Sequence, residues 1–217
     1  MNNLYIAIAG NISAGKSTLT KILAEKFQAK PIFEPVSENP YLADFYKDMK
    51  RWSFHSQMFF LSQRLRDQFL LSKESGIFIQ DRTIYEDAEI FAKNLFERGF
   101  IEKRDWDIYQ RFYQTISDLL PSPDLIIYLK NSVPTIKKRI KIRGRKFEQK
   151  IDGEYLLDLN RLYNDWETNF SIKSKRGNKK IPFLTIPLDN LNYLEDPKKL
   201  DHVINLIIKK LEGKQAV

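Results

Sequence analysis

The chain contains no cysteine and only two histidines, His55 and His202, among its 217 residues. The absence of cysteine excludes disulfides and any zinc or iron–sulfur site built on thiolates. Neither histidine has partners at the spacing of a metal pair or a Ser-His-Asp triad, so both are interpreted as ordinary helix residues. A cysteine-free composition is compatible with a reduced cytoplasmic compartment.

Long hydrophobic runs are also missing. No apolar run approaches the roughly 18 residues that a membrane helix needs, and residues 1–3 (Met-Asn-Asn) lack the basic start of a signal peptide. We therefore expect a soluble, cytoplasmic protein that has no membrane partner. The length of 217 residues predicts a single domain over residues 1–217.

Acidic residues are in deficit. The net charge is +8, from 36 basic and 28 acidic residues. Such an excess is compatible with nucleic-acid binding, with an anionic ligand such as ATP, or with a solvated surface. Because many lysines are scattered through helical segments, the surface interpretation comes first, and no nucleic-acid partner is expected.

Short apolar runs alternate with longer segments of helical periodicity. Strands are predicted at residues 4–9, 31–36, 77–80, 125–129 and 183–187. Helices are predicted at 18–27, 53–72, 84–98, 105–120, 134–143, 155–166 and 197–213, with Asp105 as a helix N-cap. The alternation predicts an α/β fold with a five-stranded parallel sheet and helices on both faces. Residues 174–180, polar and basic, are predicted to be the least ordered loop.

A phosphate-binding motif follows the first predicted strand. Residues 10–17 read Gly-Asn-Ile-Ser-Ala-Gly-Lys-Ser and match G-x-x-x-x-G-K-[ST] without a mismatch. Backbone N–H groups and the following helix N-terminus would surround a triphosphate, Lys16 would reach its β- and γ-phosphates, and Ser17 would bind Mg²⁺. The predicted ATP-binding residues are Gly10, Asn11, Ile12, Ser13, Ala14, Gly15, Lys16, Ser17 and Thr18.

Charged residues end two other predicted strands. Glu34 ends the second, and Asp81, followed by Arg82, ends the third. Ligands of doubly wound sheets gather at the carboxyl ends of strands. There Glu34 could accept a proton from a hydroxyl, Asp81 could hold Mg²⁺ through water, and Arg82 could neutralise phosphate charge. An exposed glutamate and a surface Asp–Arg pair are the alternative interpretations.

Three arginines lie on or just after the predicted basic helix 134–143. Arg139 and Arg143 are four residues apart and share a helix face, and Arg145 follows. Such a segment, residues 139–148, could close over a transferring phosphoryl group as a basic lid. A solvated basic face is the alternative.

The predicted strand at 125–129 bears on the class of reaction. It is not followed by the Asn-Lys-x-Asp motif that reads guanine, which disfavours a GTP-binding switch protein. Transfer of a phosphoryl group to a small acceptor is favoured instead. Two alternatives stay open from these residues, a nucleoside monophosphate kinase and a non-catalytic nucleotide-binding regulator or nucleic-acid ATPase.

The motifs as an ordered set resemble the deoxynucleoside kinase family, from Tyr5 to about Trp166. The set comprises the P-loop, Glu34-Pro35-Val36, Tyr46, Arg51-Trp52-Ser53-Phe54, Gln57, Asp81-Arg82, and Arg143-Gly144-Arg145 with Glu148. The resemblance implies a P-loop kinase fold, ATP as phosphate donor, Mg²⁺ as cofactor, a deoxynucleoside as acceptor, and a homodimer. One departure is Asp81, where many animal members have glutamate.

The same resemblance implies roles for residues around the acceptor. Glu34 resembles the base that faces the 5′-hydroxyl, while Tyr46 and Glu148 resemble the pair that holds the 3′-hydroxyl of the sugar. Lys16, Arg82 and the three lid arginines complete the implied catalytic set. The lid arginines match those that cover the phosphates in the family.

For the nucleobase, Gln57 resembles the glutamine that reads the base edge, with one donor and one acceptor side by side. Trp52 and Phe91 resemble aromatic walls of the pocket. Arg64 and Asp87 match a pair found in members that accept purines or deoxycytidine. Residues 39–42, Asn-Pro-Tyr-Leu, resemble bacterial purine deoxynucleoside kinases. Deoxyadenosine is therefore the first expected substrate, ahead of deoxyguanosine and deoxycytidine.

Overall fold

The computed structural model describes residues 3–170, 180–189, 191, 193 and 196–215. Within these residues, five parallel strands form one sheet in the order β2-β3-β1-β4-β5. The strands are β1 (Leu4–Ala9), β2 (Lys30–Ile32), β3 (Ile77–Asp81), β4 (Leu125–Lys130) and β5 (Phe183–Pro187). The predicted α/β fold with a five-stranded parallel sheet is confirmed.

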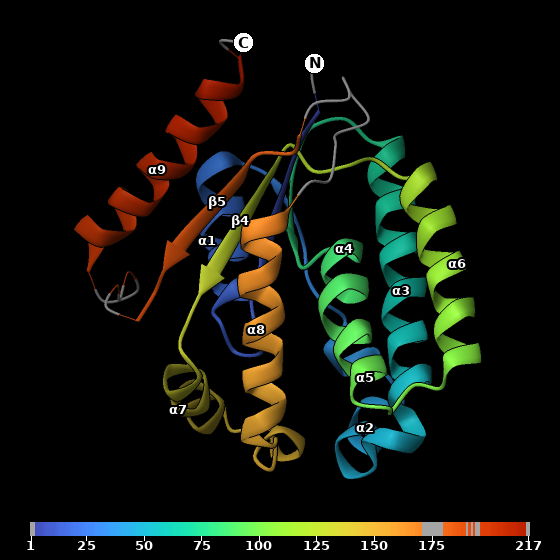
Figure 1. Ribbon diagram of the computed structural model, residues 1–217. Helices are drawn as coiled ribbons and strands as arrows, with labels where there is room; N and C mark the ends of the chain where they lie inside the picture. The colour runs from blue at the N-terminus through green and yellow to red at the C-terminus, as the bar shows by residue number, and fades with distance from the viewer. Residues whose placement is uncertain (1–2, 171–179, 190, 192, 194–195, 216–217) are drawn as a thin grey trace.

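Helices cover both faces of the sheet (Figure 1). In β1, Tyr5, Ala7 and Ala9 face one hydrophobic cluster, whereas Ile6 and Ile8 face another. A strand that buries apolar residues on both of its faces is typical of a parallel sheet covered by helices. The first cluster is covered mainly by α3 (Met49–Lys73), α6 (Lys103–Leu119) and α8 (Gly153–Asn169), and the second by α1 (Lys16–Phe27) and α9 (Pro197–Gln215).

The predicted helix at 84–98 is a composite in the structure. It consists of α4 (Ile84–Glu86), a π-helical segment η2 (Asp87–Ala92) and α5 (Lys93–Glu97). It ends before Gly99, whose φ of 71° is the left-handed conformation that suits a helix terminus. A π-segment inside an α-helix is frequently found at a functional site.

Three further short elements were not predicted. They are α2 (Leu42–Lys47) and two 3₁₀ turns, η1 (Val36–Glu38) and η3 (Lys146–Glu148). The basic helix α7 spans Val133–Arg143, close to its prediction. Helix α3 begins earlier than predicted because the Asp48 side chain accepts a hydrogen bond from the backbone N–H of Arg51 at 3.1 Å.

Two boundary predictions were wrong. The strand predicted at 31–36 spans only Lys30–Ile32, so Glu34 lies two residues beyond it. Pro35 has no N–H for a ladder, and the chain turns into η1 directly after it. Asp105 is not an N-cap, because α6 begins at Lys103 and Asp105 lies in its first turn. The loop predicted at 174–180 lies outside the described residues except for its last position.

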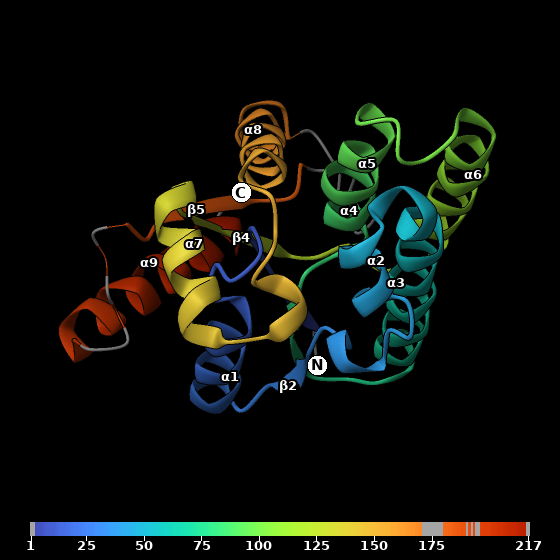
Figure 2. The same ribbon diagram turned by 90° about the horizontal axis from the view of Figure 1, so that it is seen from below.

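The carboxyl ends of the strands lie at the end of the molecule where the sequence predicts the site. Figure 2 looks onto this end, where α7 and the turn η3 lie on one side and α2 lies on the other. The P-loop and the residue that ends β3 open toward the same end. Among the helices of the described ranges, none is both long and apolar enough to cross a bilayer.

Candidate active site

Residues 10–15 form a tight loop between β1 and α1, as the motif predicts. Gly10 has a φ of 151°, and a Cβ atom there would lie 3.0 Å from both the Ala14 Cβ and the Leu129 carbonyl oxygen. Gly15 has a φ of 101° and immediately precedes α1. Both positions therefore require glycine. Gly10 is required by its backbone conformation and by close packing, and Gly15 by its backbone conformation. The resulting loop presents the N-terminus of α1 to an anion.

Lys16 folds back over this loop. Its Nζ donates hydrogen bonds to the carbonyl oxygens of Gly10 at 2.9 Å and Asn11 at 3.0 Å. Burial, together with the nearby charge of Arg82, lowers the pKa of Lys16 to about 8, although the carboxylate of Asp81 opposes the shift. The ammonium group is thus held at the centre of the loop, where a phosphate would lie.

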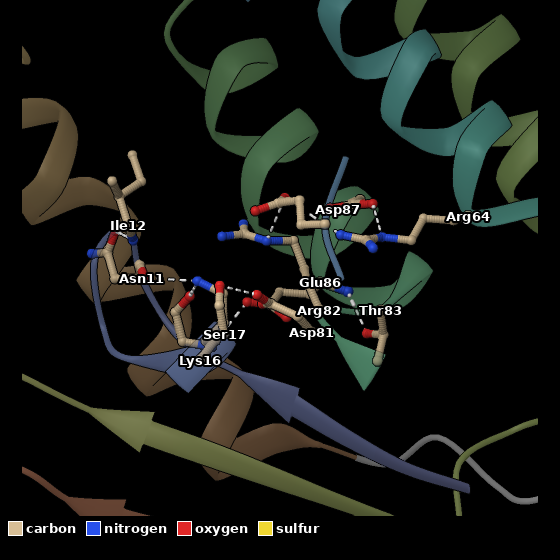
Figure 3. A network of polar contacts seen from close by, with 12 residues as sticks. Asn11, Ile12, Lys16, Ser17, Arg64, Asp81, Arg82, Thr83, Glu86 and Asp87 are labelled. Atoms are coloured by element: carbon tan, nitrogen blue, oxygen red, sulfur yellow. Dashed lines mark hydrogen bonds and ion pairs between the residues drawn. The ribbon is translucent and has the colours of Figure 1, made fainter. Parts of the chain in front are cut away.

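Ser17 and Asp81 meet across the site. The Ser17 hydroxyl donates to Oδ2 of Asp81 at 2.5 Å (Figure 3), and the Asp81 Oδ1 is buried and finds no hydrogen-bond partner in the part of the chain that the structure describes. A hydroxyl beside an unsatisfied carboxylate oxygen is a donor set that fits Mg²⁺. No cluster of three or more acidic or histidine ligands occurs in the described ranges. Water and phosphate oxygens would therefore complete the coordination, as is usual for Mg²⁺.

Glu34 lies between two arginines from different elements. Its Oε1 is 3.0 Å from Arg82 Nε and 3.4 Å from Arg64 Nη2. Burial alone would raise the pKa of Glu34, but the charges of Arg82 and Arg64 outweigh it and hold that pKa below its ordinary value. The carboxylate is therefore ionised at neutral pH and can accept a hydrogen bond from a hydroxyl.

Arg64 and Asp87 form the pair expected from the sequence. Arg64 Nε donates to Asp87 Oδ2 at 3.1 Å, and both side chains are buried (Figure 3). Burial raises the pKa of Asp87, and the charge of Arg64 opposes the shift. Within the described ranges, the Nη1 atom of Arg64 has no hydrogen-bond partner. The pair supplies fixed charges at the inner end of the site.

Two adjoining cavities open at this end of the sheet. The larger, about 710 Å³, is lined by the P-loop, Asp81, α7 and the segment after β5. The smaller, about 60 Å³, lies between α2, α3 and η2. Six residues line both cavities: Ser13, Lys16, Glu34, Val36, Arg143 and Arg145. A phosphate in the larger cavity and a hydroxyl in the smaller one would meet between a lysine, two arginines and a carboxylate.

Most residues predicted to hold the acceptor line the smaller cavity. They are Glu34, Tyr46, Gln57, Arg82, Asp87, Phe91 and Glu148. The Oε1 atom of Gln57 is buried and has no hydrogen-bond partner from the residues that the structure describes, so an acceptor is available on the wall. Glu148 accepts from Arg143, and from Arg145 at 3.3 Å. Tyr46 stacks on Phe147 with ring centroids 5.6 Å apart, which joins α2 to η3.

Two residues of the predicted acceptor set, Trp52 and Arg64, do not line the smaller cavity, whereas the lid residue Arg139 lines the larger one. The Trp52 ring stacks on Tyr41 at 5.7 Å and is not on the cavity wall, so its predicted contact with a base has no geometric support here. Arg64 lies behind Asp87 and reaches the site through it and Glu34. Arg139 Nη1 donates to the Ala14 carbonyl oxygen at 2.8 Å, so this lid residue contacts the P-loop directly.

Sequence reasoning missed two long-range polar contacts of the P-loop. Asn11, predicted only as an ATP-binding residue, donates to Asn160 Oδ1 at 2.6 Å and so joins the loop to α8. Glu86 accepts from the Gly10 N–H at 2.9 Å. Residues 83–86 match a Thr-x-x-Glu capping box, which is a signal for a helix start and not for this long-range contact.

Comparison with known proteins agrees with this geometry. The family model described as deoxynucleoside kinase matches residues 6–212. The chain belongs to the deoxynucleoside kinase family. The deoxyadenosine/deoxycytidine kinase of Bacillus subtilis is 34% identical over 215 residues, covering 98% of this chain and 95% of the relative. The deoxyguanosine kinase of the same organism is 37% identical over 215 residues, covering 94% and 98%.

Solved structures are also similar to this deoxynucleoside kinase. Deoxyadenosine kinase from M. mycoides with bound dATP has 32% sequence identity and a TM-score of 0.76, with 94% of this chain and 98% of that one covered. The same enzyme with bound dCTP has 32% identity and a TM-score of 0.76, with 95% and 100% covered. The P-loop kinase fold expected from the sequence is confirmed. Family membership decides against the monophosphate kinase and the non-catalytic regulator.

Proposed function

We propose that this deoxynucleoside kinase transfers the γ-phosphate of ATP to the 5′-hydroxyl of deoxyadenosine, with deoxyguanosine and deoxycytidine as further acceptors. The observation that carries the proposal is the junction of the two cavities at Lys16, Glu34, Arg143 and Arg145. It supports a donor triphosphate on one side and an acceptor hydroxyl on the other, with positive charge where the phosphoryl group passes.

In the larger cavity, the P-loop backbone binds the phosphates and Lys16 neutralises the β- and γ-phosphates. Ser17 and Asp81 would hold Mg²⁺, which supplies positive charge to the triphosphate when bound. Arg139, Arg143 and Arg145 cover the phosphoryl group from the lid segment 139–148. Arg139 already contacts the P-loop, which supports this arrangement.

In the smaller cavity, Glu34 accepts the hydrogen bond, and later the proton, of the 5′-hydroxyl. A carboxylate with a low pKa is a weak base, but phosphoryl transfer has a loose transition state in which little proton removal is needed early. Arg82 holds Glu34 in place and adds charge beside the phosphoryl group. Tyr46 and Glu148 bind the 3′-hydroxyl of the sugar.

The base is bound by Gln57, with the Arg64–Asp87 pair behind it and Phe91 on the wall. Gln57 offers an unpaired acceptor and can pair with adenine or cytosine through both ends of its amide. Relatives named deoxyadenosine/deoxycytidine, deoxyadenosine and deoxyguanosine kinase support a purine or cytosine base. Trp52 does not line this cavity, so its contact with the base stays a prediction.

A cytoplasmic homodimer of single-domain chains completes the proposal. Helices α3 and α6 lie side by side on the outside of the molecule (Figure 1). Their outer faces expose large apolar side chains, which is the property of an interface. The exposed residues are Leu65, Phe69 and Leu70 on α3 and Ile108, Phe112 and Leu119 on α6.

The test is a coupled assay of ADP release with ATP and Mg²⁺. The acceptors are deoxyadenosine, deoxyguanosine, deoxycytidine, thymidine, dAMP and single-stranded DNA. Turnover with the first three and little with thymidine is expected. Turnover with dAMP alone, or ATP hydrolysis stimulated by DNA without acceptor phosphorylation, would refute the proposal.

A further inference from the structure

One buried carboxylate at the site has no part in the mechanism above. Glu86 is wholly buried and lines neither cavity. Its Oε1 accepts hydrogen bonds from the backbone N–H of Gly10 at 2.9 Å and from the Tyr163 hydroxyl. Gly10 directly follows β1, Glu86 lies on α4 and Tyr163 lies on α8, so the contact joins three separate elements.

Gly10 links Glu86 to the catalytic lysine. Its N–H is held by Glu86, and its carbonyl oxygen accepts the Nζ hydrogen bond of Lys16 at 2.9 Å. Gly10 has a φ of 151°, so its own conformation is one that few residues adopt. The Glu86 carboxylate therefore fixes the orientation of the residue on which Lys16 rests.

The local sequence predicts a different contact for Glu86. Thr83 caps α4 by accepting from the Glu86 N–H at 3.2 Å, which is one half of a capping box. In the full motif the glutamate side chain reaches back to the N-cap N–H. Here that side chain reaches the P-loop instead, and its Oε2 is buried and has no hydrogen-bond partner among the described residues.

Burying a carboxylate with one oxygen unsatisfied costs stability. Burial raises the pKa of Glu86, while the charges of Arg82 and Lys16 oppose the shift. Thr83 alone already caps α4, so the helix does not need the Glu86 carboxylate. The position of the Glu86 side chain therefore indicates a role in holding the P-loop and not in capping the helix.

We propose that Glu86, oriented by Tyr163, is a positioning residue that holds Gly10 and thereby sets Lys16 and the P-loop for the triphosphate. The inference deepens the proposed function and rests on it for the identity of the donor. It assigns to α4 and α8 a direct hold on the phosphate loop. Glu86 acts through Gly10 and touches no reacting atom.

The first measurement is the dissociation constant of ADP, determined by calorimetry in EDTA so that neither metal nor turnover contributes. Glu86→Ala removes the acceptor and should weaken ADP binding about 10-fold or more, the effect of losing a hydrogen bond to a charged group. Glu86→Gln keeps an acceptor oxygen and should restore most of the affinity. The KM for deoxyadenosine should stay within about 2-fold in both variants, because Glu86 does not line the acceptor cavity.

Glu89 supplies a matched control three residues along the same helical run. It accepts from the Tyr113 hydroxyl at 2.8 Å and from Trp166 Nε1 on α8 at 2.7 Å. It thus ties the same helical run to α8, as Glu86 does, and also to α6, while its two hydrogen bonds both lie away from the P-loop. Glu89→Ala should lower the melting temperature while leaving ADP affinity within about 2-fold, the result of a structural role alone.

A second matched pair serves if Glu86→Ala does not fold. Tyr163→Phe should weaken ADP binding about 3-fold, and Tyr113→Phe should not, because Tyr163 donates to Glu86 whereas Tyr113 donates to Glu89. Equal ADP affinities within either matched pair would overturn the inference. Failure of the wild type to phosphorylate any deoxynucleoside would refute the proposed function instead, and the ADP measurements separate the two cases.

Discussion

Arg82 links Glu34 to Phe91: its Nε is 3.0 Å from the Glu34 Oε1, and its guanidinium carbon lies 3.9 Å from the centre of the Phe91 ring. Arg82 has a φ of 72°, which is uncommon for a residue with a side chain. Its backbone N–H is nevertheless paired, at 2.9 Å, with the Ile8 carbonyl oxygen of the central strand. Arg82 thus connects Glu34, the proposed general base, with Phe91 on the wall of the acceptor cavity. Strained residues such as Arg82 are often found at functional sites.

Glu34→Gln should lower kcat by about 10²–10⁴, the usual contribution of a general base, with the KM for deoxyadenosine nearly unchanged. The amide keeps the shape of the side chain but cannot take the proton. The melting temperature should also fall, because Arg82 and Arg64 lose a buried countercharge. Glu38→Gln, an exposed change on η1, is the matched control and should leave kcat unaltered. An increase of KM alone in Glu34→Gln would make Glu34 an orienting residue and not the base.

The pKa of Lys16 predicts the alkaline limit of the enzyme. Burial lowers that pKa to about 8, so the ammonium group loses its proton as the pH rises through this value. The value of kcat/KM for ATP, which reports the free enzyme, should be constant near neutrality and fall above about pH 8. The pKa of Glu34 is below its ordinary value, so no acid loss from Glu34 is expected near neutrality.

Lys16→Arg provides the control for this profile. Arginine stays protonated over the whole range, so the variant should be less active but should lack the decline above about pH 8. A decline of equal size and position in wild type and variant would mean that another group sets the alkaline limit.

The P-loop and the Asp81-Arg82 dipeptide could be predicted because their chemistry is local. In each case a buried strand, the turn residues and the polar side chains follow one another within a few positions. The Arg64–Asp87 pair could be predicted only from the resemblance to the deoxynucleoside kinase family, because 23 residues separate its members. Its burial and geometry had to come from the structure.

Contacts between distant segments could not be predicted. Glu86 and Gly10 are 76 residues apart, and Asn11 and Asn160 are 149 apart. Neither pair follows a helical or strand period, so no local pattern indicates it. The boundary of β2 failed for a related reason. The length of an edge strand depends on its one partner strand and on where the chain turns away, and both are tertiary properties.

Tyr46→Phe should reduce the preference of the enzyme for 2′-deoxy over 2′,3′-dideoxy substrates. The hydroxyl of Tyr46 is proposed to bind the 3′-hydroxyl together with Glu148, and both residues line the acceptor cavity. Removing one partner of a buried hydrogen bond costs about 1–3 kcal/mol, so the ratio of kcat/KM values should shrink several-fold. Tyr41→Phe is the control, because Tyr41 stacks on Trp52 away from the cavity. Equal discrimination by wild type and Tyr46→Phe would remove Tyr46 from the sugar site.

Replacement of both Arg64 and Asp87 should move the enzyme toward thymidine. The pair fixes a buried donor and a buried acceptor at 3.1 Å, and Asp87 lines the acceptor cavity. A thymine methyl group would press against these polar groups and deprive them of solvation. Arg64→Met with Asp87→Ala removes both charges together and leaves an apolar wall. The ratio of kcat/KM for deoxyadenosine to that for thymidine should therefore fall.

Each single replacement should behave differently from the pair. Either one leaves the other charge buried, which costs about 3–5 kcal/mol in comparable cases. The singles should therefore lose melting temperature and activity without gaining thymidine turnover. Arg98→Met with Asp158→Ala breaks a more exposed ion pair of 2.8 Å and is the matched control, for which the ratio should not change. A wild type that already prefers thymidine would refute deoxyadenosine as the substrate and leave the kinase assignment intact.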